Sequence, residues 1–153
     1  MSFAVVNENV RAYKVAGHQH IPEMETVLSK GAGTEVTLSF VPHLVPITRG
    51  IYTTIHATMA KSCSEADLHE VYCQAYGDAP FVRIRESIPQ VKNVAYSNYC
   101  DIGFTIDQRT EQVILTSTID NLVKGAAGQA IQNMNAMLGL PETLGLDAPA
   151  VYP

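Results

Sequence analysis

The sequence predicts an α+β fold with a mixed, largely antiparallel sheet and helices on one face of it. Three observations support this prediction. Residues 50–60, 100–107 and 112–120 alternate in side-chain character as strands do, and a polar turn joins the last two. Residues 64–76 have the spacing of an amphipathic helix, and 122–138 indicate a second helix, ended by a glycine and a proline. The elements follow no repeated strand–helix unit, which argues against a parallel α/β sheet.

Composition is typical of a single globular domain. The chain has 153 residues, enough for one core, and we expect residues 1–153 to form that domain. Charged residues make up 16% of it, against roughly 25% in average chains, which is explained if a partner or another domain covers a large face. The net charge of −5 and the lack of Lys or Arg runs argue against nucleic-acid binding.

Neither a membrane nor an oxidising compartment is indicated. No apolar run reaches the roughly 18 residues of a membrane span, and the first residues lack the basic and apolar regions of a signal peptide. Cys63, Cys73 and Cys100 are odd in number and have no C-x-x-C spacing. We therefore expect a cytoplasmic protein with reduced, structural cysteines and no metal bound by them.

The N-terminal third predicts a strand, a helix, a second strand and a loop, at residues 11–16, 22–30, 35–41 and 42–50. Pro22 suits the first turn of the helix, and Gly31 is expected to end it. Pro42 and Pro46 lie four residues apart in the loop. Because proline donates no N–H, we expect this loop to be ordered but outside any strand ladder.

The remaining elements should build the sheet and cover it. Ser64 and Asp67 form a capping box that starts the first of the two later helices. The apolar stripe of that helix is expected to comprise Leu68, Val71, Tyr72 and Ala75. A short strand is expected at 81–85, and the sheet face rich in Thr and Tyr is a candidate dimer surface. Gly125 and Gly128 each cost the last helix about 1 kcal/mol relative to Ala, which indicates that something approaches its backbone closely.

Two histidines, His18 and His20, stand just before the first helix. If residues 12–20 are extended, both side chains point to the same face. The positive end of a helix disfavours an imidazolium, so the pair could supply a neutral general base. The same residues could instead be ordinary polar side chains or two ligands of a zinc site. The third zinc ligand would be Glu23, Glu25 or His43. No metal-ligand spacing selects one of these, and we expect no metal.

Arg49 is the other candidate binding residue. It lies in the proline-flanked loop and could bind a carboxylate or phosphate, although a surface salt bridge is the simpler explanation. Lys124 and the small residues after it lack the G-x-x-x-x-G-K-[ST] spacing of a phosphate-binding loop. The sequence contains no dinucleotide-binding glycine motif and no spacing that singles out a Ser-His-Asp arrangement.

Four segments resemble the N-acetyl-gamma-glutamyl-phosphate reductase family, in order and nearly end to end, at residues 9–25, 40–50, 120–130 and 138–143. They include GHQHIPE at the histidine pair and DNLVKGAAG at the last helix. The resemblance implies NADPH-dependent reduction of N-acetyl-glutamyl phosphate to the semialdehyde, with release of phosphate, in arginine biosynthesis. It also implies a fold like the C-terminal domains of glyceraldehyde-3-phosphate and aspartate-semialdehyde dehydrogenases. The family's Rossmann domain and its Gly-Cys-Tyr-Pro nucleophile are absent from this sequence.

By position, the resemblance implies that His20 is the catalytic histidine, that His18 is its substrate-side neighbour and that Arg49 lies at the substrate. The residues it places at the cofactor are Asn121, Lys124 and Gly125. The helix at about 121–140 would dock on the Rossmann domain. We therefore expect a homo-oligomer, either dimer or tetramer, that is inactive without the Rossmann half and binds no NADP by itself. The alternatives are a non-catalytic dimerisation or small-anion-binding module and a zinc hydrolase.

Overall fold

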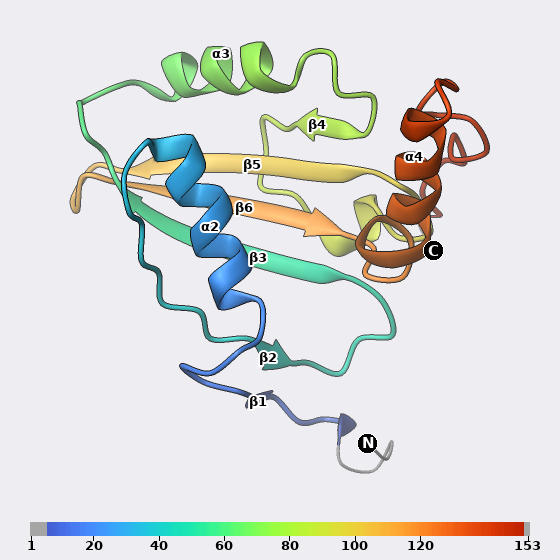
Figure 1. Cartoon of the computed structure of the whole chain (residues 1–153). Helices are drawn as coiled ribbons and strands as arrows, with labels where there is room; N and C mark the ends of the chain where they lie inside the picture. The colour runs from blue at the N-terminus through green and yellow to red at the C-terminus, as the bar shows by residue number, and fades with distance from the viewer. Residues whose placement is uncertain (1–5, 152–153) are drawn as a thin grey trace. The chain divides into compact units, whose positions relative to one another are not determined.

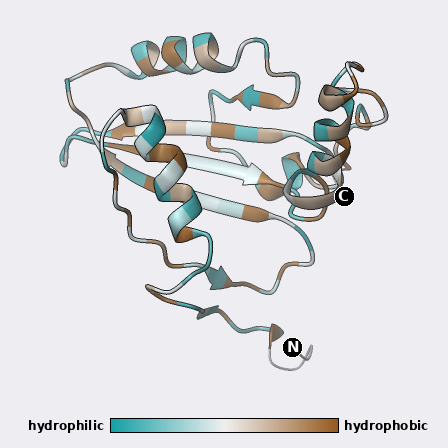
Figure 2. Ribbon diagram, viewed as in Figure 1, coloured by the Kyte–Doolittle hydropathy of each residue, from teal (hydrophilic) through white to brown (hydrophobic). Residues whose placement is uncertain are grey.

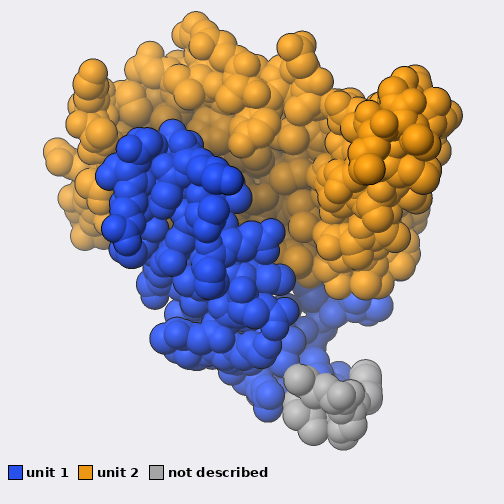
Figure 3. All heavy atoms as spheres, viewed as in Figure 1, with its two compact units in different colours: residues 1–48 blue, residues 49–153 orange. Residues whose placement is uncertain are grey.

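The computed structural model describes residues 6–151 of the chain (Figure 1). The chain forms two compact units, residues 1–48 and 49–153, which are blue and orange in Figure 3. Among the described residues, the first unit has a two-stranded sheet and the second a four-stranded sheet. In the same part of the chain, no helix has both the length and the apolar character needed to cross a membrane.

The first unit contains a helix and a short pair of strands. Helix α2, Ile21–Ala32, has Pro22 in its first turn, where the missing N–H costs nothing, and is followed by Gly33 with a φ of 68°. Hydrophilic and hydrophobic residues alternate along this helix in Figure 2, as in an amphipathic helix. Strands β1, Arg11–Ala12, and β2, His43–Leu44, pair antiparallel.

Both strands predicted for this unit differ from the structure. The strand expected at 11–16 is two residues long, and the strand expected at 35–41 does not form. The second segment bonds to α2 instead, because the Leu38 N–H donates to Glu25 Oε1 at 3.2 Å. A carboxylate on the helix therefore accepts this backbone N–H, in place of the carbonyl group that a neighbouring strand would offer.

The end of α2 and the proline-flanked loop also differ from the predictions. The helix continues past Gly31, because Gly33 is the residue that adopts the left-handed conformation. The loop at 42–50 was expected outside any ladder, yet two of its residues form β2 and pair with β1. Pro42 contributes here as an acceptor: its carbonyl accepts the Tyr13 N–H at 3.0 Å. A proline lacks only the donor, so it can flank a short ladder.

The second unit is built on a mixed sheet with the strand order β3–β6–β5–β4. In that order, the strands are Ile51–Thr58, Gln112–Ile119, Cys100–Asp107 and Val82–Ile84. Of these pairings, β4 with β5 is parallel and the others are antiparallel. The mixed, largely antiparallel sheet and its four predicted strands are therefore confirmed, with small shifts at the strand ends.

Helix α3, Glu65–Tyr76, packs against this sheet. Its predicted capping box is confirmed: Ser64 Oγ accepts the Asp67 N–H, and the Asp67 carboxylate accepts the Ser64 N–H. Tyr72 stacks on Phe104 of β5, with ring centroids 5.3 Å apart. The helix thus covers the face of the sheet that carries Phe104.

The first residue of α3 joins the helix to β5. Glu65 Oε1 accepts both the Thr105 hydroxyl, at 2.7 Å, and the Ile106 N–H, at 3.0 Å. These donors lie beyond the short pairing with β4. The predicted apolar stripe of α3 is wrong in part: Tyr72 contacts the sheet, but Val71 is 59% exposed.

The opposite face of the sheet carries Thr and Tyr side chains, as predicted. Tyr52 lies opposite Thr118, and Thr118 opposite Asp101, on neighbouring strands. The loop between β4 and β5 covers part of this face, because a Cβ added at Gly103 would lie 2.6 Å from Pro89 Cδ. Among residues 6–151, the buried apolar residues are Phe81, Val94, Ala95, Ile106, Val113 and Leu146. Use of the remaining face in a dimer stays a prediction.

The C-terminal helix has two parts, the π-helix η2, Val123–Ala127, and helix α4, Gly128–Met137. Together they confirm the helix predicted at 122–138. A Cβ at Gly128 would lie 2.8 Å from the Val123 carbonyl oxygen and would overlap Asn98 Oδ1. The groups that lie close to the backbone of Gly128 are therefore those of Val123 and Asn98, in the same chain.

Candidate functional site

The two histidines lie at the start of α2. His20 is its N-cap residue and is exposed, and His18 lies in the turn before it. Residues 13–20 contain turns rather than an extended strand, so the alternation that we predicted is wrong. The two rings still meet, with centroids 4.9 Å apart and planes at 69°. A turn, not a strand, brings the imidazoles together.

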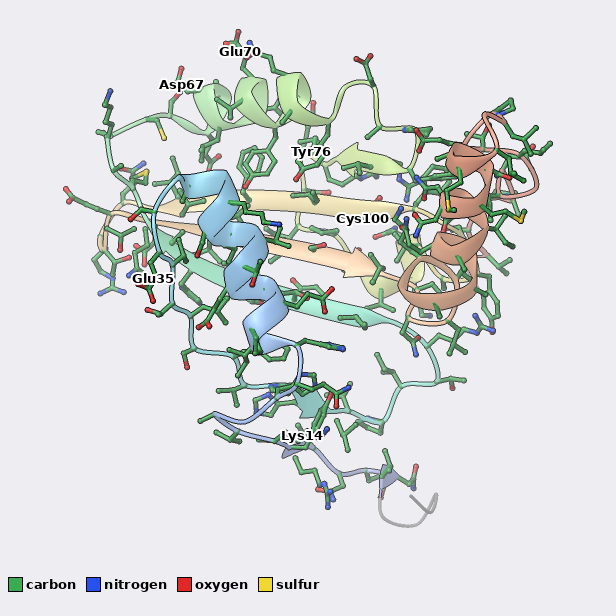
Figure 4. All side chains as sticks on the ribbon, viewed as in Figure 1. Lys14, Glu35, Asp67, Glu70, Tyr76 and Cys100 are labelled. Atoms are coloured by element: carbon green, nitrogen blue, oxygen red, sulfur yellow. The ribbon has the colours of Figure 1, made fainter. Side chains whose placement is uncertain are left out.

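His18 is enclosed on several sides. Tyr13 and Phe40 contact its ring edge-on, with centroids at 5.7 and 5.2 Å, and the residue is 9% exposed. Its Nδ1 accepts the His20 N–H at 3.2 Å. Burial lowers the pKa of His18 below its ordinary value, and the charges of His20 and of Lys14, labelled in Figure 4, lower it further. This environment favours the neutral imidazole.

The zinc alternative lacks a third protein ligand in this part of the chain. His43, one of the candidates, places Nδ1 3.0 Å from the Val41 carbonyl oxygen. Within residues 6–151, no three His, Cys, Asp or Glu side chains are grouped to hold a metal ion. A zinc site needs three or four such ligands.

Arg49 is held by contacts at the start of β3. Its Nη1 donates to both carboxylate oxygens of Asp120, at 3.0 and 3.3 Å. The guanidinium carbon lies 4.3 Å from the centroid of the Tyr96 ring, a cation–π contact. The next residue is fixed as well, because the Gly50 N–H donates to Asn121 Oδ1 at 2.7 Å. The arginine side chain remains 26% exposed, so part of the guanidinium faces solvent.

Asp120, which our sequence reasoning missed, organises this region. Its side chain is fully buried, yet it accepts the N–H groups of Tyr96, Leu122 and Val123 besides the bonds from Arg49. Burial raises the pKa of Asp120, but these hydrogen bonds lower it by more, so the pKa lies below its ordinary value. An Asp just before a helix often caps the N–H groups two or three residues on, and this was the available signal.

The three residues expected at the cofactor lie at the start of the C-terminal helix: Asn121, Lys124 and Gly125. Lys124 Nζ donates to Gln132 Oε1 at 2.7 Å and lies 5.6 Å from the centroid of the Phe81 ring. Burial lowers the pKa of Lys124, and nearby acidic groups oppose that shift. A Cβ at Gly125 would find only ordinary contacts, the nearest at 3.5 Å. Lys124 is thus engaged within its own chain.

The structure groups the predicted site residues into two sets. His18 and His20 meet in the first unit; in the second, Arg49 pairs with Asp120, and the neighbouring Asn121 accepts the N–H of Gly50. The first set offers imidazoles for proton transfer. The second offers a fixed guanidinium, the group that best matches a carboxylate or phosphate.

Comparisons with known proteins give a family and close relatives. A family model described as the semialdehyde dehydrogenase dimerisation domain matches residues 1–121. Proteins named N-acetyl-gamma-glutamyl-phosphate reductase are 52% identical over 153 residues in Pelotomaculum thermopropionicum and 54% identical over 154 residues in Geobacter sp. strain M21. Each match covers 99% of this chain and 44% of the relative. The chain therefore spans less than half the length of these relatives.

Solved structures share the fold at low sequence identity. Aspartate semialdehyde dehydrogenase II from Vibrio cholerae matches with a TM-score of 0.67 and 16% identity, over 88% of this chain and 42% of that one. The aspartate semialdehyde dehydrogenase from Francisella tularensis gives a TM-score of 0.65 and 13% identity, over 88% and 40%. At this level of identity the likeness concerns the fold, and it confirms the expected fold class.

Proposed function

Because this chain belongs to the semialdehyde dehydrogenase dimerisation-domain family, we propose that it forms part of an N-acetyl-gamma-glutamyl-phosphate reductase. The proposed reaction reduces N-acetyl-glutamyl phosphate to the semialdehyde and releases phosphate. Relatives with this name, about half identical over nearly the whole chain, support the proposal. The proposal assigns the nucleophilic cysteine and the Rossmann domain to the part of those relatives that has no counterpart in these 153 residues.

The histidine pair at the start of α2 is the observation that carries this proposal. An exposed imidazole at a helix N-cap is placed to exchange protons with a bound substrate. His20 has this position, and His18 beside it is buried. We therefore assign the transfer of protons to His20: it would take a proton from the attacking thiol and give one to the same sulfur when it leaves as the semialdehyde forms.

Arg49 is proposed to bind an anionic group of the substrate, a carboxylate or a phosphate. Asp120 already balances its charge, so Arg49 would act chiefly through the direction of its N–H donors. Tyr96 and Asp120 fix the guanidinium before a ligand arrives, which lowers the entropy that binding costs.

NADP is the proposed cofactor, and it would supply the hydride to the acyl group. Asn121 fits a contact with a nicotinamide carboxamide, because its Oδ1 accepts the Gly50 N–H and its Nδ2 is left to donate. Lys124 fits less well, since its Nζ bonds to Gln132 and its amine is partly desolvated. The contact of Lys124 and Gly125 with a cofactor stays a prediction.

A homo-oligomer is proposed as the assembled form, as the family description indicates. Apolar residues are exposed on two parts of the second unit. On β3, Tyr52 is exposed on the Thr- and Tyr-bearing face, and Ile51 and Ile55 are exposed on the face that carries Phe104. On and after α4, the exposed apolar residues are Ile131, Met134, Met137, Leu138 and Leu140. We assign the α4 surface to the Rossmann domain of the complete enzyme and the Thr- and Tyr-bearing sheet face to a second copy.

Reconstitution tests the proposed function. The chain would be fused to the part of the Pelotomaculum relative that precedes its matching segment, and NADP-dependent turnover of N-acetyl-glutamyl phosphate would be measured. We expect turnover by the fusion and none by the 153-residue chain or by the relative's segment alone. A folded fusion without turnover would contradict the proposal and favour a non-catalytic module.

A further inference from the structure

We infer that His18 is a positioning residue and not a second base. As a neutral imidazole with its hydrogen on Nε2, it holds the backbone of His20 through Nδ1. The inference deepens the role proposed for His20, and its catalytic meaning rests on that proposed function. Its physical content, the tautomer and the hydrogen bond, concerns this chain alone.

The direction of one hydrogen bond determines the tautomer of His18. The His20 backbone N–H lies 3.2 Å from His18 Nδ1, and a backbone N–H can only donate. Nδ1 must therefore offer its lone pair, and a neutral imidazole then carries its hydrogen on Nε2. Protonation of His18 would place a hydrogen on Nδ1 and break this contact.

His43 provides the opposite case in the same unit. Its Nδ1 lies 3.0 Å from the Val41 carbonyl oxygen, which can only accept. Nδ1 of His43 must therefore carry a hydrogen. The chain thus contains two histidines that are expected to differ in tautomer, and each serves as the reference for the other.

The bond from His20 to His18 fixes where α2 begins. A side-chain acceptor that binds the N–H two residues on makes the contact of an Asx turn. His20 is the N-cap, and its own side chain makes no capping bond. Tyr13 and Phe40 hold the His18 ring, so the acceptor stays in place. The His20 ring is thereby positioned while its nitrogens remain available for substrate.

Two substitutions of His18 distinguish a positioning role from a role as a second base. Asparagine carries an oxygen at the position of Nδ1 and is the residue that Asx turns prefer, so His18→Asn should keep the acceptor. Glutamine places its amide at the position of Nε2, so His18→Gln should lose the acceptor. A positioning role predicts rescue by Asn and not by Gln.

The test uses the 153-residue chain labelled with 15N. Imidazole spectra should show His18 protonated on Nε2 and His43 on Nδ1. The His20 amide should exchange with solvent at a similar rate in wild type and His18→Asn, and roughly tenfold faster in His18→Gln. A hydrogen on Nδ1 of His18, or equal exchange in both variants, would overturn the inference.

The activity of the fused enzyme decides a different question. A fusion that is inactive, while the isolated chain shows the expected tautomers and the rescue by Asn, would contradict the proposed function and support the positioning of His20 by His18. An active fusion in which His18→Asn retains the wild-type pH profile and His18→Gln loses turnover would support both.

Discussion

Arg49 donates from Nη1 to both carboxylate oxygens of Asp120, a residue 71 positions later in the sequence. The Asp120 side chain is completely buried. The pair ties the start of β3 to the start of the C-terminal helix. A buried carboxylate needs both a counter-charge and hydrogen-bond donors, and here it has both. Loss of one partner should therefore cost much more than loss of a surface ion pair.

Replacing Arg49 should destabilise the second unit strongly. Arg49→Met keeps an apolar stem but leaves Asp120 without its cation, and we expect a loss of about 3 kcal/mol in the free energy of unfolding in urea. Arg109→Met is the matched control, because Arg109 is 82% exposed where it pairs with Asp107. That control should cost less than about 1 kcal/mol. Similar losses in the two variants would contradict the structural role of the buried pair.

Asp120 should make stability depend on acid pH. Its pKa in the folded chain lies below the ordinary value of 3.8, so the unfolded chain binds the proton more readily. The stabilisation is therefore complete above pH 3.8 and is lost as the pH falls through the folded pKa. Denaturant titrations at decreasing pH should show a steeper loss in wild type than in Asp120→Asn. Parallel curves would show that Asp120 does not titrate differently in the two states.

His18 should add a second pH dependence nearer neutrality. Its pKa is lowered on folding from 6.5, because burial and nearby positive charges disfavour the imidazolium. Its stabilising contribution is present above pH 6.5 and is lost as the pH falls through the folded pKa. Hydrogen exchange of α2 amides should rise over this range in wild type, whereas His18→Asn should flatten the profile. An unchanged profile in the variant would assign the titration to another group.

Two helical glycines should respond in opposite ways to the same substitution. A Cβ at Gly31 meets nothing within 4 Å, so Gly31→Ala should stabilise the chain by up to about 1 kcal/mol. A Cβ at Gly128 would meet the backbone carbonyl of Val123 and Asn98 Oδ1, so Gly128→Ala should destabilise it. Thermal unfolding of both variants, each compared with wild type, measures this. Stabilisation by Gly128→Ala would show that Asn98 is free to move aside.

Elements encoded by neighbouring residues were predictable from the sequence. Ser64 and Asp67 are three positions apart and satisfy each other's backbone donors, so the start of α3 needs no distant partner. The hairpin at 100–107 and 112–120 combines strand-like alternation with a polar turn, and its register follows from the turn. The histidine pair was found for the same reason, although the turn that brings the rings together was not.

Features that depend on distant partners were missed. Residues 35–41 alternate as a strand does, but the Leu38 N–H bonds to Glu25 of the preceding helix. The alternation of apolar and polar residues in this segment does not show that a helix side chain accepts its backbone N–H. Asp120 and Arg49 are likewise separate in the sequence, and only the fold shows that one balances the charge of the other. Side-chain acceptors and buried ion pairs are decided by tertiary contacts, which a periodicity does not encode.

The role of His20 is the central claim, and one substitution in the fused enzyme tests it most directly. His20→Asn removes the imidazole from the N-cap of α2 but leaves a residue that caps helices well. We expect kcat to fall by about 100-fold or more, because a general acid–base group is lost, while thermal stability is retained. Undiminished turnover by a folded His20→Asn enzyme would contradict the assignment of proton transfer to His20.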